Sequence, residues 1–99
     1  MSDTKHTTGP WHEGSHRTVE SQNGTICEVY SHMGIEEADA NQKLIAAAPE
    51  LLEALNQQLY FLNVLSGTVP LHEEPTHRRI KLQQEELRAA IAKATGGAA

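Results

Sequence analysis

Histidines near the single cysteine are the residues of this chain most suited to chemistry. His12 and His16 lie four positions apart, Cys27 and His32 follow them, and imidazole nitrogens and thiolates are common zinc ligands. However, the sequence has neither a CxxC nor an HExxH frame. His12 and His16 also fall in an expected loop or strand, where a spacing of four does not bring two side chains to one face. We therefore expect no metal site and no cofactor.

Cys27 could also serve as a nucleophile if a histidine acted as its base. It falls in a predicted strand next to Ile26, where a thiol that packs in the interior is the expected role. The sequence has no glycine-rich phosphate loop and no recognisable pair of carboxylates in an apolar pocket. We expect that the protein is not an enzyme.

Four residues are candidates for binding a partner. Trp11 and Tyr30 can stack on a base or on a side chain of another protein, and Arg78 and Arg79 can hold a phosphate or an acidic patch. Structural roles compete with each assignment. Trp11 is expected to pack the hairpin against the first helix, because tryptophan is usually well buried, and the arginines are expected on the solvated face of the last helix.

Composition limits the class of protein. The 99 residues carry a net charge of −5, are 38% hydrophobic and only 4% aromatic, and suffice for one small domain. Direct binding of nucleic acid is not expected, because it requires clustered lysine and arginine, and the chain has one short basic cluster at residues 77–81. A single cysteine, with no signal peptide and no apolar run of membrane-spanning length, predicts a soluble cytoplasmic protein.

The N-terminal half is expected to begin with a flexible lead-in over residues 1–9 and to continue as a β-hairpin over residues 17–30. Asn23-Gly24 is a typical hairpin turn, because both residues tolerate positive φ. A two-residue loop would place Val19 opposite Glu28, whereas a three-residue loop would place it opposite Cys27. The sequence leaves both registers open.

Three helices are expected, over about residues 36–48, 49–66 and 75–95. Proline costs about 3 kcal/mol or more inside a helix, yet it is well tolerated at the first helical position. Glu50 and Glu53 follow Pro49, as is typical of a first turn. We therefore favour two helices with a corner at Pro49, and one kinked helix remains the alternative. The last two helices should form a long antiparallel αα-hairpin, so the predicted fold is α+β in a single domain over residues 10–99.

Leucines at spacings of three and four give residues 51–65 an apolar stripe. This stripe is more than a small hairpin can cover, and a chain of this size gains stability by self-association. We expect a homodimer or a higher homo-oligomer, with Leu55, Leu59 and Leu62 at its interface.

Two segments carry a resemblance to known proteins. "TGPW" at residues 8–11 and "EADANQKLIAAAPELLEAL" at residues 37–55 resemble a family of small phage and prophage proteins, which has a Pro-Gly-Pro-Trp opening and an ANAxLIAAAPELLEAL helix. The resemblance covers roughly residues 7–55. Gln42 stands where the family usually has alanine, and Thr8 where it often has proline. The family has no established chemistry, so the resemblance implies a phage origin and no catalytic residues.

A phage origin suggests a counter-defence or accessory role that works by binding in the host cytoplasm. The first hypothesis is an inhibitor of a host defence protein, such as a CRISPR-type effector, because an acidic protein complements a basic target that binds nucleic acid. The second is an oligomer that sequesters a nucleotide immune signal, using Trp11 or Tyr30 with Arg78 and Arg79. The third is a structural or regulatory phage component.

Overall fold

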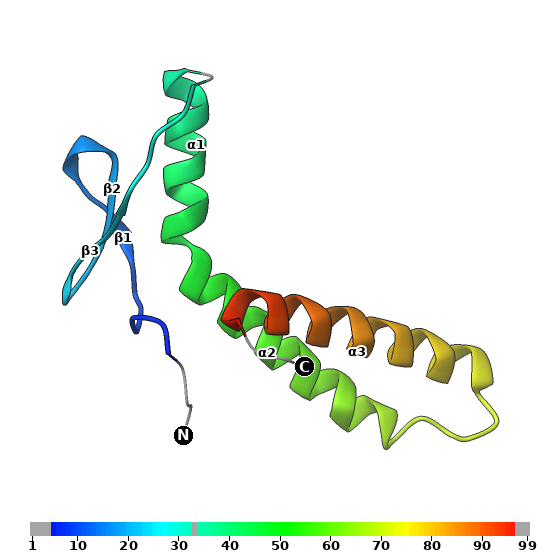
Figure 1. Cartoon of the computed structure of the whole chain (residues 1–99). Helices are drawn as coiled ribbons and strands as arrows, with labels where there is room; N and C mark the ends of the chain where they lie inside the picture. The colour runs from blue at the N-terminus through cyan, green and yellow to red at the C-terminus, as the bar shows by residue number, and fades with distance from the viewer. Residues whose placement is uncertain (1–4, 33, 97–99) are drawn as a thin grey trace. The chain divides into compact units, whose positions relative to one another are not determined.

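The computed structural model describes residues 5–32 and 34–96 of the chain. Its elements, in chain order, form a three-stranded antiparallel sheet followed by three α-helices (Figure 1). This arrangement confirms the predicted α+β class, with a β-hairpin before the helices. The elements are β1 (His12–Glu13), the 3₁₀ turn η1 (Ser15–Arg17), β2 (Thr18–Ser21), β3 (Gly24–Glu28), α1 (Ile35–Ala46), α2 (Ala48–Ser66) and α3 (Glu74–Thr95).

The chain divides into two compact units, Met1–Leu51 and Leu52–Ala99. The N-terminal unit holds the sheet, α1 and the first turn of α2, and the C-terminal unit holds the rest of α2 together with α3. The single domain expected over residues 10–99 stays a prediction, because compactness within each unit does not decide whether the two fold together.

The hairpin register combines features of both predicted alternatives. Gln22 and Asn23 form a two-residue loop, with Ser21 opposite Gly24. The ladder then shifts by one residue at Ile26, and beyond this β-bulge Val19 lies opposite Cys27. A bulge breaks the alternation of side chains along a strand. For this reason Ile26 and Cys27, although adjacent, both pack against the core, an arrangement that neither regular hairpin provides.

The strand β1, which the sequence does not predict, makes the hairpin a three-stranded sheet. His12 pairs with Glu20, and Glu13 pairs with Val19. The two residues of β1 are exposed and polar, so no hydrophobic alternation marks the strand in the sequence.

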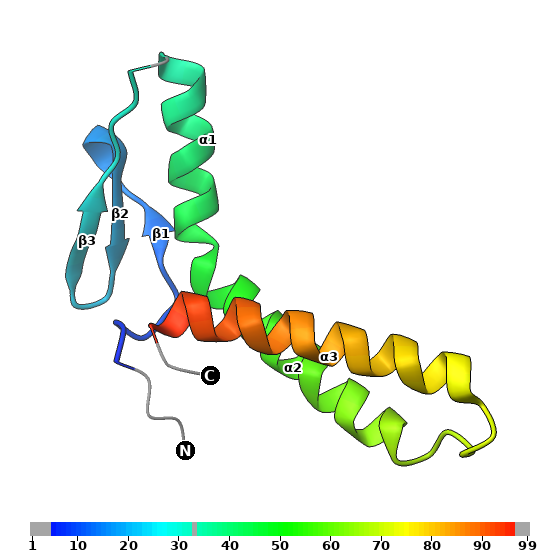
Figure 2. The same cartoon turned by 45° about the vertical axis from the view of Figure 1, so that its right-hand side comes forward.

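The core of the N-terminal unit lies between the sheet and α1, which run side by side in Figures 1 and 2. Val19, Val29 and Ala46 form its buried cluster. Trp11 packs against this cluster, which is the packing role favoured from the sequence. Small residues of α1 face the sheet and permit a close approach, so the sheet and helix share a core with few large side chains. The partly buried residues around the cluster are Trp11, Ile26, Cys27 and Ile45.

Two helices, and not one, occupy residues 35–66. α1 ends at Ala46, Ala47 follows as its C-cap, and α2 begins at Ala48. Pro49 is the second residue of α2, where its missing N–H would have no intrahelical acceptor. The division therefore falls where the proline predicts it.

The C-terminal unit contains the predicted antiparallel αα-hairpin, in which α2 and α3 lie side by side (Figure 2). Leu62 of α2 and Ile80 of α3 are buried. Asn63 Oδ1 accepts a hydrogen bond of 2.8 Å from Gln84 Nε2 and thereby joins the two helices. α3 ends at Gly96, whose left-handed φ of 69° gives a typical C-terminal cap.

Candidate binding surface

The net charge of the chain resides entirely in the N-terminal unit. Residues 1–51 carry eight acidic and three basic side chains, which give −5, whereas residues 52–99 carry five of each and are neutral. Five acidic residues and no lysine or arginine occur between positions 18 and 42. The negative charge that can attract a cationic partner therefore lies on the N-terminal unit.

Carboxylates and exposed apolar side chains follow one another along the chain where β3 ends and α1 begins. We call this group the Tyr30 surface. Tyr30 is 78% exposed and Ile35 is 69% exposed, values far above those of the core residues nearby. Ser31 Oγ donates a hydrogen bond to the Glu37 carboxylate and so ties the connection to the first turn of α1. The members of the Tyr30 surface are Glu28, Tyr30, Ile35, Glu36 and Glu37.

A glycine with positive φ determines how the chain enters α1. Gly34 is the N-cap of α1 and has a φ of +117°, a conformation that residues other than glycine rarely adopt. Its carbonyl oxygen accepts a hydrogen bond of 3.1 Å from the backbone N–H of Ala38. Glu36 and Glu37 follow in the first turn, where the helix dipole favours negative charge.

The tyrosine on this surface stays protonated and acts as a hydrogen-bond donor. Its hydroxyl donates to Glu28 Oε1 at 2.8 Å. This hydrogen bond, together with the negative charge of Glu28, raises the pKa of Tyr30 above its usual value. Within the described residues, Glu28, Glu36 and Glu37 form no ion pair with lysine or arginine. Their charge is available to a partner, and the neutral phenol adds apolar area.

The backbone beneath the surface is fixed to both the sheet and the helix. Val29 is buried, and its N–H donates to the Arg17 carbonyl at 2.8 Å. The Arg17 side chain pairs with Asp39 of α1. His16 and Arg17 both have positive φ, 57° and 60°, which costs on the order of 1 kcal/mol or more for each residue. The contacts of Arg17 are thus obtained at some cost in backbone energy.

A buried amide provides the other link between the sheet and α1. Gln42 is 6% exposed. Its Nε2 donates to the Gly14 carbonyl at 3.2 Å and to the Thr18 carbonyl at 2.9 Å. Both acceptors flank η1, so one side chain holds the turn against α1. Sequence reasoning missed this role, although the spacing of Ala38, Gln42 and Ala46 places all three on the same buried face.

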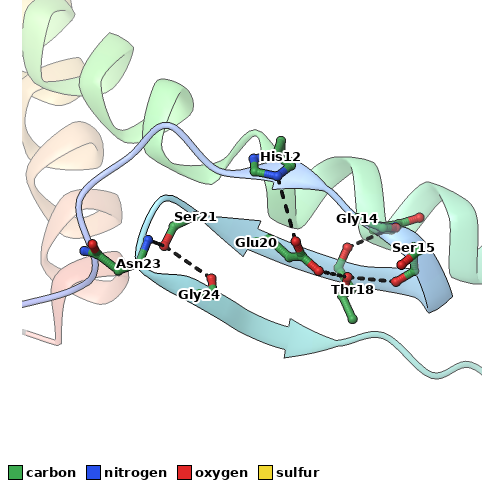
Figure 3. A network of polar contacts seen from close by, with 9 residues as sticks. His12, Gly14, Ser15, Thr18, Glu20, Ser21, Asn23 and Gly24 are labelled. Atoms are coloured by element: carbon green, nitrogen blue, oxygen red, sulfur yellow. Dashed lines mark hydrogen bonds and ion pairs between the residues drawn. The ribbon is translucent and has the colours of Figure 1, made fainter.

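A polar network on the sheet contains a histidine, a carboxylate and a hydroxyl (Figure 3). His12 Nε2 lies 4.0 Å from Glu20 Oε1, and Thr18 Oγ1 lies 2.8 Å from Glu20 Oε2 and 2.8 Å from the Ser15 carbonyl. The carboxylate separates the imidazole from the hydroxyl, whereas a nucleophile and its base must be hydrogen-bonded to each other. These contacts join β1 to β2 and hold η1 against β2, so they support the fold of the sheet.

The remaining residues with metal-binding chemistry do not gather. Across residues 5–32 and 34–96, no group of three or more histidine, cysteine, aspartate or glutamate side chains is placed to hold a metal ion. Cys27 is half-buried and packs against the core cluster. None of the helices in these ranges has both the length and the hydropathy that crossing a bilayer requires.

The four predicted binding residues are divided between the two units. Trp11 Nε1 donates to the Thr7 carbonyl at 3.2 Å, and its ring packs against the core, whereas Tyr30 is exposed. Arg78 and Arg79 lie on α3, where Arg78 Nη1 is 3.6 Å from Glu74 Oε1. The assignment of these four residues to binding stays a prediction. Tyr30 alone among the four combines an aromatic ring, high exposure and neighbouring charge.

The predicted oligomer residues all lie on α2. Leu62 is 4% exposed, and Leu55 and Leu59 are half-buried. Other apolar side chains of the same helix are far more exposed, among them Tyr60, Phe61 and Val64. A homo-oligomer through Leu55, Leu59 and Leu62 stays a prediction.

Comparison with known proteins places nearly the whole chain in one family. The family model described as Salmonella phage P22 protein Y8K6 matches residues 1–98. No curated protein and no solved structure matches the chain. The match extends well beyond the two segments of the sequence resemblance and includes the αα-hairpin.

Proposed function

The chain belongs to the family described as Salmonella phage P22 protein Y8K6, and from this premise we propose that it is an accessory protein that binds and inhibits a basic host defence protein. The Tyr30 surface is the observation that carries the proposal. It presents three carboxylates without a cationic partner among the described residues, beside an exposed tyrosine and an exposed isoleucine. The setting would be the host cytoplasm.

The chemistry of this surface suits a protein that itself binds nucleic acid. Such proteins expose clustered lysine and arginine that neutralise phosphates. Glu28, Glu36 and Glu37 could occupy these cations and exclude the nucleic acid, with Tyr30 and Ile35 supplying apolar contact at the centre. Complementary charge would also accelerate association and make it sensitive to salt. A CRISPR-type effector is a target of this kind.

The same features weigh against a nucleotide at this surface. A nucleotide immune signal carries phosphates, which the carboxylates near Tyr30 would repel. The indole N–H of Trp11 is already bonded to Thr7. Inhibition of a protein is therefore the better-supported hypothesis. The nucleotide sponge can be tested by analysing the small molecules that are bound to the purified protein.

A plaque assay tests the proposal with two matched variants. The protein is expressed in host cells that carry a CRISPR-type defence, and the plating efficiency of a sensitive phage is measured. Glu36→Gln/Glu37→Gln removes two negative charges from the Tyr30 surface. Glu85→Gln/Glu86→Gln removes two from an adjacent exposed pair on α3. The native protein and the α3 variant should restore plating, and the variant with a neutralised Tyr30 surface should lose most of this effect.

Circular dichroism of both variants must show native helix content, since Glu36 and Glu37 also interact favourably with the α1 dipole. Equal activity of the two variants would show that the carboxylates of the Tyr30 surface are not needed for inhibition. Mass spectrometry of small molecules released by denaturing the purified protein completes the test, and a stoichiometric nucleotide would favour the sponge instead.

A further inference from the structure

One side of α2 leaves three large apolar side chains in solvent. Tyr60 is 71% exposed, Phe61 is 56% exposed and Val64 is 50% exposed. Residues at i, i+1 and i+4 lie on one side of a helix. This side points away from Leu62, which is buried within the helical hairpin. We call Gln57, Tyr60, Phe61 and Val64 the outer face of α2.

The outer face also lies in a segment without charge. No aspartate, glutamate, lysine or arginine occurs from Ala54 to Leu71, a run of eighteen residues. At the overall charged content of 21%, about four charges would be expected there. Protein interfaces are depleted of charge at their centres and enriched in tyrosine and phenylalanine. An exposed helix face of this composition has the character of an interface.

Leu82 on α3 provides a contrast within the same unit. It is 56% exposed, as Phe61 is, but charged residues lie three and four positions away on both sides of it. These neighbours are Arg78, Arg79, Glu85 and Glu86. A single apolar side chain among charges is ordinary for a surface, so exposure alone does not distinguish the outer face of α2.

We propose that the outer face of α2 binds the same face of a second copy of this chain. The C-terminal unit needs additional burial, because Leu62 and Ile80 are the buried residues of α2 and α3 in the described part of the chain. Two helices with so few buried side chains are marginal by themselves, and small units commonly gain stability by oligomerisation. A partner recognised through charge would find none here, whereas permanent homodimers use apolar faces.

The size of the aromatic pair supports the assignment. A tyrosine or phenylalanine buries about 150–250 Å² when it is fully covered. From their exposures, Tyr60 and Phe61 could bury roughly 250 Å² per copy, about a third of the ~800 Å² that each partner contributes to a stable complex. They would form the centre of the interface, and Gln57 and Val64 would extend it.

Charge determines the direction in which the two copies of α2 pack. Its acidic residues, Glu50 and Glu53, lie near one end. Parallel packing would bring the two Glu53 side chains together. In an antiparallel pair with its two-fold axis between Tyr60 and Phe61, each Glu53 would lie about 11 Å from the axis along the helix. The two would then be about 22 Å apart, beyond the screening length of about 8 Å, and Gln57 would face Val64 of the second copy.

Sedimentation equilibrium of the full chain tests the proposal. The native protein should have twice the chain mass of 10.9 kDa. Phe61→Glu should reduce the mass to one chain, with partial loss of helix content. Leu82→Glu, at equal exposure, should leave the dimer unchanged. A native protein that stays at 10.9 kDa at high micromolar concentration overturns the proposal, as does a Phe61→Glu variant that remains a dimer.

Disulfide trapping tests the direction of packing. Gln57→Cys and Val64→Cys are each made in a Cys27→Ser background, and the two proteins are mixed, unfolded, refolded together and oxidised. An antiparallel pair predicts that the mixed disulfide, which joins one copy of each variant, dominates. A parallel pair would instead give disulfides between two copies of the same variant and would refute the assigned geometry. Absence of every crosslink, despite a dimeric mass, would place the interface elsewhere and overturn the proposal.

Discussion

The buried amide of Gln42 should be a main support of the N-terminal unit, and Gln42→Leu tests this role. Leucine keeps a side chain of similar size, so little cavity is created. The variant loses the donor to the Gly14 carbonyl and the donor to the Thr18 carbonyl. The Thr18 carbonyl still accepts a hydrogen bond of 2.9 Å from the Gly14 N–H. Gly14 loses its Gln42 donor, and its carbonyl must then be satisfied by water or remain unpaired.

The size of the effect follows from the two hydrogen bonds. Each contributes a net free energy of about 0.5–1.5 kcal/mol, and a buried carbonyl left unpaired costs about 1–3 kcal/mol. We expect Gln42→Leu to lower the free energy of unfolding by about 2 kcal/mol. With an m-value of about 2 kcal/mol/M, the urea midpoint would decrease by about 1 M.

The single tryptophan makes the measurement specific to this unit. Trp11 packs against the cluster of Val19, Val29 and Ala46, so its fluorescence reports the unfolding of the sheet and α1. Asn41→Leu is the control, because Asn41 precedes Gln42 on α1 but is exposed, and it should change stability by less than about 0.5 kcal/mol. A Gln42→Leu midpoint equal to that of the native protein would refute the reasoning and show that the two hydrogen bonds contribute nothing net.

Three further predictions concern other parts of the chain. Pro49→Ala should change the free energy of unfolding by less than about 1 kcal/mol, because the proline is not strained at the second position of α2; a gain of several kcal/mol in urea unfolding would contradict this. Glu28→Gln should lower the pKa of Tyr30 toward its usual value, since both the charge and the strong acceptor are lost, and a phenolate absorbance titration in a Tyr60→Phe background checks it. Protein purified without a metal-affinity tag should contain no stoichiometric zinc, and Cys27→Ala should retain inhibition in the plaque assay; zinc by elemental analysis, or inactivity of a folded variant, would count against a function by binding alone.

Features set by local sequence could be predicted, because their causes lie within a few residues. Pro49 and the acidic residues after it divide α1 from α2, and leucine spacing produces the helical hairpin. The β-hairpin itself could be predicted in the same way, but its register could not. A bulge is a compromise between the loop geometry at Gln22–Asn23 and the burial of Val29 beyond it, and neither segment reveals the other.

The candidate surface was only partly accessible from the sequence for a related reason. Tyr30 stands out by its residue type, but its burial depends on a register that the sequence leaves open. The carboxylates of Glu36 and Glu37 are helix-dipole partners in the sequence, and the N-cap of the helix that carries them requires the positive φ of Gly34. In the sequence, Gln42 only interrupts a face of small residues. Its role is hidden because its acceptors are backbone carbonyls 24 and 28 positions earlier in the chain.

The bulge at Ile26 also determines which side chains beyond β3 face the core. Without the shift, the ladder that begins at Ser21 and Gly24 would continue with Ile26 opposite Val19. Val29 would then point to solvent, and Tyr30 would point into the core. The register of the ladder beyond Ile26 therefore decides whether Tyr30 is exposed or buried. Deletion of Ile26 would remove the bulge and leave Cys27 opposite Val19, so Tyr30 would stay exposed. The bulge thus lets β3 carry an additional residue without turning the tyrosine into the core.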